Sequence, residues 1–177
     1  MAFRIIVVIL FCALLFYVCY KNTGTDQKNM LGFRNYPDNV QEACRKSSKL
    51  KNIVPEVKSV STILVSNFIL FTILFSFVGV LAVNQLNFTS YLDAFIYFLI
   101  LGEVLNAFDL FVIDLLWWRN TPRIRFSILK EKEPYQDPKK HVDSFLRGIP
   151  MYIVVALVVA FIVRLFKWTN ILKRQWN

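Results

Sequence analysis

Polar side chains interrupt a long apolar stretch in the second half of the sequence. The stretch runs from about residue 92 to Trp118, and its polar members are Asp93, Glu103, Asn106, Asp109 and Asp114. A charged side chain at the centre of a bilayer costs about 2.5–3.5 kcal/mol on insertion scales, so such residues are rare in membrane spans and usually serve a function. The candidate intramembrane polar site therefore consists of Glu103, Asn106, Asp109 and Asp114.

Depth along the helix separates these residues. With a rise of about 1.5 Å per residue, Asp114 lies only about 4–5 Å below Trp117, where we expect it to reach Arg119 or interfacial water. On the same scale Asp109 is about 12 Å deep and Glu103 about 21 Å deep. These two carboxyl groups therefore bracket the middle of a hydrocarbon core that is about 30 Å thick.

The spacing of the deeper residues places them on one side of a helix. Glu103, Asn106 and Asp109 step by three, which spreads them over about 120° of an α-helix. Such a band should face other helices or a wet cavity rather than lipid. The first two apolar stretches carry no Lys or Arg at a matching depth. We therefore expect the carboxyl groups to be protonated, or to share a proton or a cation.

Three interpretations of this polar band stay open. It is a proton- or cation-binding site of a transporter that uses Glu103 and Asp109, or a carboxylate pair of an intramembrane enzyme. Alternatively, it consists of protonated acids that bond to Asn67 or to hydroxyl groups of the second stretch, which is a purely structural role. No phosphate-binding loop, nucleophile elbow or other catalytic pattern accompanies the acids, so no catalytic residue is assigned.

The cysteines and the single histidine do not indicate a metal site. Cys12 and Cys19 lie in the first apolar stretch, Cys44 lies in a basic segment, and no CxxC or Cys/His cluster is present. We expect His141 to be a solvated or helix-capping side chain. Neither a metal nor a cofactor is expected.

The composition predicts that these residues are carried by membrane-spanning helices. Hydrophobic residues make up 56% of the 177, which exceeds the share typical of soluble domains. Four stretches are apolar on all sides and long enough to span, at about residues 5–20, 60–83, 92–118 and 149–166. The sequence thus predicts an all-α, polytopic helical bundle with four transmembrane helices in a single membrane domain, residues 1–177. A cleaved signal peptide is the alternative for the first stretch.

The basic residues predict an orientation. Of the 21 Lys and Arg, sixteen lie in residues 21–59 and 119–148, which places both of these segments in the cytoplasm and both termini on the outer side. Trp117, Trp118 and Trp168 lie near span ends, where they are expected to act as interfacial anchors. No motif for reading nucleic acid accompanies the charges, so no nucleic-acid partner is expected.

Each cytoplasmic segment shows some local pattern. Asp38 and Gln41 resemble a capping box before a short amphipathic helix that ends at Pro55, and we expect this helix to lie on the inner membrane surface. Residues 123–128 alternate basic and apolar side chains, which favours a short strand. Pro150 is expected in the first turn of the fourth span.

One resemblance is carried by the C-terminal half. The run from Asn106 to Trp118, the triplet Tyr135–Gln136–Asp137 and the segment His141–Gly148 resemble small uncharacterised membrane proteins of low-GC Gram-positive bacteria. The resemblance implies a bacterial plasma membrane and a shared C-terminal core, and it adds no mechanism.

The function that these patterns favour is that of a non-enzymatic or accessory subunit of a membrane complex. Its partners would be the lipid bilayer and a second copy or another membrane protein, contacted through the third span. A small proton- or cation-coupled transporter component using Glu103 and Asp109, and an intramembrane enzyme using the same carboxylates, are the alternatives.

Overall fold

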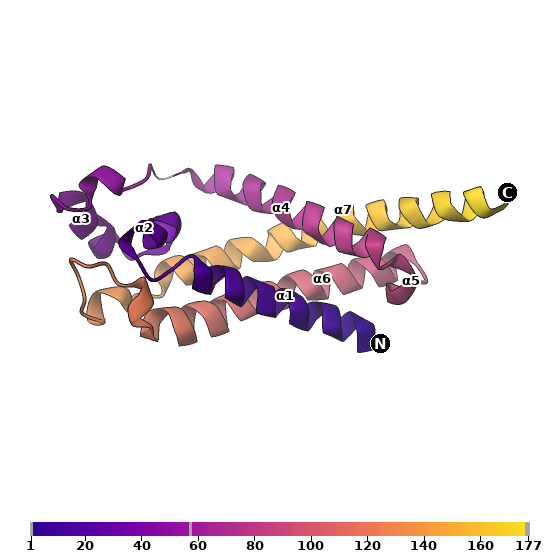
Figure 1. Ribbon diagram of the computed structural model, residues 1–177. Helices are drawn as coiled ribbons and strands as arrows, with labels where there is room; N and C mark the ends of the chain where they lie inside the picture. The colour runs from indigo at the N-terminus through magenta and orange to yellow at the C-terminus, as the bar shows by residue number, and fades with distance from the viewer. Residues whose placement is uncertain (1, 57, 176–177) are drawn as a thin grey trace. The chain divides into compact units, whose positions relative to one another are not determined.

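The protein is an all-α chain with four long apolar helices, as the sequence predicts. A computed structural model describes residues 2–56 and 58–175, with side chains described up to residue 169 (Figure 1). Within that part of the chain, four helical segments are long and apolar enough to cross a membrane: Ala2–Lys21, Val60–Leu81, Tyr91–Asn120 and Glu133–Thr169. The four predicted spans overlap these helices one for one.

Contacts divide the chain into two compact units. Unit 1 comprises Met1–Ile9, Lys58–Leu105 and Arg147–Asn177, and unit 2 comprises Leu10–Val57 and Asn106–Leu146. Helices α1 (Ala2–Lys21), α6 (Tyr91–Phe108) and α7 (Lys139–Gln175) contribute residues to both units. Helices α4 (Val60–Leu81) and α5 (Val83–Leu86) lie wholly in unit 1.

Unit 1 is held together by aromatic packing between apolar helices. The ring of Phe75 on α4 stacks with Phe98 of α6 and Tyr152 of α7, with centroid distances of 6.1 and 6.4 Å. Gly102 allows the close approach of α7, because a Cβ there would lie 2.6 Å from the ring of Tyr152. Small residues let apolar helices approach closely in this way, and the resulting van der Waals packing helps to hold helices together within a bilayer.

The exposed face of α6 in unit 1 is a stripe of apolar residues. Leu92, Ile96, Ile100 and Val104 follow one another at intervals of four, and all are exposed. Residues four apart share one face of an α-helix. In a spanning helix this stripe is the face suited to lipid or to another apolar helix.

The two basic segments of the chain fold together in unit 2. They form short elements: α2 (Asp26–Asn29), the 3-10 helix Met30–Asn35, α3 (Asp38–Lys46), and the 3-10 turns Lys51–Ile53, Trp118–Asn120, Pro122–Ile124 and Glu133–Tyr135. We call this part, residues 22–56 and 118–138, the headpiece. Its core of buried residues is Met30, Phe33, Tyr36, Val40, Cys44, Leu50, Trp118, Ile124, Phe126 and Tyr135.

The predicted strand at residues 123–128 is wrong, and tyrosine hydroxyls explain why. The Tyr36 hydroxyl donates to the carbonyl of Ile124 at 2.8 Å, and the backbone N–H of Phe126 donates to the Tyr135 hydroxyl at 3.0 Å. These side chains satisfy backbone groups that a strand would pair with a neighbouring strand. The segment therefore packs as a 3-10 turn and irregular chain.

The helix predicted after Pro37 is present as α3, but it ends at Lys46 rather than at Pro55, and its surroundings differ from those expected. Val40 and Cys44 are fully buried in the headpiece core. The capping box is absent: the Gln41 amide instead donates to the carbonyls of Arg34 and Tyr36, at 3.0 and 2.9 Å. The apolar face of α3 thus packs against protein.

Two expectations near the last spans are also corrected. Helix α7 begins at Lys139, ten residues before the predicted start, so Pro150 lies inside the helix rather than in its first turn. Trp118 was expected as an interfacial anchor but is only 8% exposed and belongs to the headpiece core. Trp117 is partly buried against Phe16, at a centroid distance of 5.2 Å, whereas Trp168 is exposed.

Candidate functional site

A π-helix carries two of the four predicted site residues. Directly after α6, residues Asp109–Trp117 form a π-helix, in which hydrogen bonds join residues five apart. Asp109 and Asp114 are five apart and therefore lie near the same face. Such helices are rare and occur often at functional sites.

His141 completes a cluster with these two residues. It is the third residue of α7, and its Nδ1 lies 2.8 Å from the Asp114 carboxylate oxygen Oδ2. Asp109 is partly buried and lies within electrostatic range of both Asp114 and His141. We call Asp109, Asp114 and His141 the Asp–His cluster.

The histidine is enclosed on its other sides. Its side chain is only 3% exposed, and its ring contacts Trp118 edge-on at a centroid distance of 4.8 Å. The expectation of a solvated or capping histidine is therefore wrong. The other ring nitrogen, Nε2, is buried and has no hydrogen-bond partner among the described residues. An unsatisfied buried polar atom of this kind costs about 1–3 kcal/mol, so its retention calls for an explanation.

Asn106 and Glu103 have separate surroundings. Asn106 is buried, and its amide donates to the backbone carbonyl of Phe145 at 3.1 Å, which ties α6 to α7 within unit 2. Glu103 belongs to the part of α6 in unit 1 and is partly buried there. Within unit 2, the structure thus brings Asp109 and Asp114 together with His141, which sequence reasoning had set aside.

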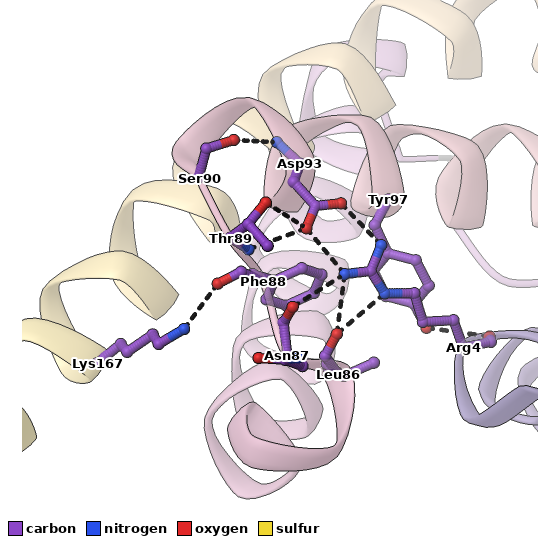
Figure 2. A network of polar contacts seen from close by, with 9 residues as sticks. All are labelled: Arg4, Leu86, Asn87, Phe88, Thr89, Ser90, Asp93, Tyr97 and Lys167. Carbon is purple, nitrogen blue, oxygen red and sulfur yellow. Dashed lines mark hydrogen bonds and ion pairs between the residues drawn. The ribbon is translucent and has the colours of Figure 1, made fainter. Parts of the chain in front are cut away.

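Unit 1 contains a second polar cluster, centred on Arg4 of α1. Its guanidinium group donates to both carboxylate oxygens of Asp93, at 2.7 and 2.9 Å, and to the Leu86 carbonyl at 3.0 and 2.9 Å. Figure 2 shows Arg4 reaching between Asp93 on one side and the turn after α5 on the other. The same group lies 4.9 Å from the ring centroid of Phe88. We call this arrangement the Arg4 clamp.

The groups around the clamp are also paired. The Asp93 carboxylate accepts a hydrogen bond from the backbone N–H of Thr89 at 3.0 Å. The backbone N–H of Asp93 donates to the hydroxyl of Ser90, the residue just before α6. The Tyr97 hydroxyl donates to the Arg4 carbonyl at 3.3 Å, and Lys167 donates to the Phe88 carbonyl (Figure 2). Asp93 is therefore neutralised by a cation, which the sequence analysis did not anticipate. The only sequence signal was an arginine at the start of one span and an acid at the start of another.

The chemistry available to the Asp–His cluster is proton binding. A distance of 2.8 Å between Nδ1 and a carboxylate oxygen requires a shared proton, whichever partner carries the charge. Among the described residues, no three His, Cys, Asp or Glu side chains are placed to hold a metal ion.

Comparisons of the sequence with protein-family models, with curated proteins and with solved structures found no significant match. Function must therefore be inferred from the geometry itself.

Proposed function

We propose that the protein is a multi-pass protein of the bacterial plasma membrane that serves as a non-enzymatic subunit of a membrane complex. The observation that supports this role most is the headpiece. Two segments separated by 61 residues of sequence form one module with its own aromatic core, rather than serving as plain connections between spans. A folded module attached to spans offers a defined surface to a partner.

In this proposal the headpiece lies in the cytoplasm and both termini lie outside. Sixteen of the 21 basic residues fall in the two segments that build the headpiece or adjoin it, and positive charge is retained on the cytoplasmic side. On the headpiece surface, Leu31 is 73% exposed. An apolar side chain this exposed is a good position from which to probe partner contact.

Orientation is tested by labelling introduced cysteines in cells. In a chain with Cys12 and Cys19 replaced by Ala, Lys28→Cys on the headpiece should react with a membrane-impermeant maleimide only after the cells are permeabilised. The matched variant Gln85→Cys, exposed on α5, should react in intact cells. Labelling of Lys28→Cys in intact cells would contradict the proposed orientation.

The subunit role is tested by crosslinking in living cells. A photoreactive residue at position 31 should give a discrete adduct of higher mass, because the headpiece surface meets a partner. The same residue at Ile73, exposed in the middle of α4, controls for chance collisions. Absence of any adduct from position 31 would argue against a complex built through the headpiece.

A transporter component is the second candidate, and the Asp–His cluster favours it. The residues proposed for this role change from Glu103 and Asp109 to Asp109, Asp114 and His141, because these three lie together in unit 2. Purified protein in liposomes with a pH gradient and a trapped dye separates the candidates. A subunit without transport activity leaves the gradient intact, whereas proton flux that Asp109→Asn abolishes would establish the transporter.

A further inference from the structure

The imidazole of His141 is the least satisfied buried side chain of the Asp–His cluster. Nδ1 is held by Asp114, whereas Nε2 is enclosed without a partner among the described residues. If Nε2 is unprotonated it is an acceptor without a donor, and if it is protonated it is a donor without an acceptor. Both forms leave one polar group unpaired, so the surroundings of Nε2 do not fix its protonation state by hydrogen bonding.

Charged and polar groups lie around the imidazole on several elements. On the π-helix it faces Asp114 directly and is within electrostatic range of Asp109. From α1, the thiol of Cys19 lies within range of both aspartates. The headpiece contributes the ring of Trp118, which carries no charge. On α7 itself, the neighbouring Lys140 is paired with Asp38 at 2.6 Å.

Two carboxyl groups in a largely enclosed place repel each other when both are ionised. Interacting sites of this kind exchange protons as a unit, and the cluster as a whole takes up or releases each proton. Protonation of Nε2 lowers the negative charge of the cluster by one and needs no other reactant. The imidazolium ion then bonds to Asp114, which is the common way to hold a charged histidine in place.

We propose that Asp109, Asp114 and His141 form a proton-binding site in which Nε2 of His141 takes up the proton and Asp114 holds the resulting imidazolium. Asp109 lies deeper along the same helix and shares the charge of the site. The proposal does not depend on whether the protein is a subunit or a transporter component, since either can respond to protons.

The chain offers a direct way to observe this proton, because His141 is its only histidine. Nitrogen-15 labelling of histidine in the full-length protein, purified without a histidine tag, gives NMR signals from one imidazole. The nitrogen shifts distinguish the two neutral tautomers from the imidazolium ion. Spectra are recorded over the range from about pH 5 to about pH 9, and we expect the signals to convert reversibly between a neutral form and imidazolium.

Substitutions then test the roles of the neighbours. Asp114→Asn should lower the pH of half-conversion, because an adjacent carboxylate favours the charged imidazole. Asp109→Asn should lower it by less. Asp38→Asn removes an exposed carboxylate that pairs with the adjacent Lys140, so it serves as the matched control and should change the value little.

The outcomes are distinct. An imidazole that keeps one neutral form throughout the range in the wild-type protein would overturn the proposal, and this measurement requires no variant to fold. A pH of half-conversion that is the same in wild type and Asp114→Asn would also overturn it. A fall in Asp114→Asn with little change in Asp38→Asn is the result that supports the site.

Discussion

The Arg4 clamp of unit 1 and the Asp–His cluster of unit 2 contain similar types of side chain. Each joins an acid on the third long helix to a basic side chain from another helix, at 2.7 Å in the clamp and 2.8 Å in the cluster. In the clamp, the guanidinium group reaches two carboxylate oxygens and two carbonyls. In the cluster, an imidazole nitrogen is left unpaired and a second carboxyl group lies nearby.

This difference distinguishes polar groups that stabilise the fold from polar groups that are available for function. A buried network whose members are all paired rigidifies a fold, because every group would lose a partner if the segments parted. A network left incomplete costs stability, and proteins retain such sites where activity needs them. The clamp therefore fixes the start of α1 to the turn between α5 and α6, whereas the cluster keeps an unpaired imidazole nitrogen that is available to bind a proton.

The largest effect is expected from removal of the clamp arginine. Arg4→Ala leaves Asp93 and the Leu86 carbonyl without their main donor, and we expect a loss of about 1–3 kcal/mol in the free energy of unfolding. Arg4→Lys should recover only part of the loss, because an ammonium group cannot match the planar fork. Unfolding in detergent micelles, followed by circular dichroism, measures both variants. A stability equal to that of wild type in Arg4→Ala would show that the clamp is not structural.

A smaller effect is expected in the headpiece, whose Trp118 contacts the ring of His141. Tyr36→Phe removes the hydroxyl that donates to the Ile124 carbonyl but keeps the ring in the aromatic core. An unsatisfied buried carbonyl predicts a loss of about 1–2 kcal/mol. Differential scanning calorimetry provides the measurement. An unchanged transition temperature would contradict the role given to tyrosine hydroxyls in holding residues 123–128.

The smallest perturbation is chemical and concerns the Cys44 thiol. Burial in the headpiece raises the pKa of Cys44 to about 11, so at about pH 8 the thiol is neutral as well as inaccessible. In a chain with Cys12 and Cys19 replaced by Ala, we expect Cys44 to resist maleimide until denaturant is added. Lys28→Cys on the exposed surface is the reactive control. Rapid reaction of Cys44 in the folded protein would show that the headpiece core opens readily.

The sequence predicted the long helices well and the polar contacts poorly. Apolar stretches such as residues 60–83 are visible because a span must be apolar on all sides. The partners of Asp93 and Asp114 were invisible because they come from segments 89 and 27 residues away in the chain, and only the folded structure brings them near. The π-helix was equally hidden, since its hydrogen-bond pattern depends on packing rather than on local composition.

In the headpiece too, the sequence predicted a local helix but not the residues that pack against it. Val40 and Cys44 predicted an amphipathic helix, and α3 is present. What covers its apolar face depends on Phe126 and Tyr135, which lie 82 to 95 residues later in the sequence. Alternation in residues 123–128 suggested a strand because burial of every second side chain gives the same pattern in a strand and in a tightly packed irregular segment.

The contrast between the two clusters is tested most directly by replacing both ionisable partners in each. Arg4→Leu with Asp93→Leu should lower the free energy of unfolding by about 2 kcal/mol, because the turn carbonyls lose their donor. Asp114→Leu with His141→Phe should leave it unchanged or raise it, since the replacement removes an incomplete buried network. Measured side by side in the same micelles, a loss in the first variant and none in the second is the predicted result. A comparable loss in both would contradict the distinction between a structural clamp and a cluster retained for proton binding.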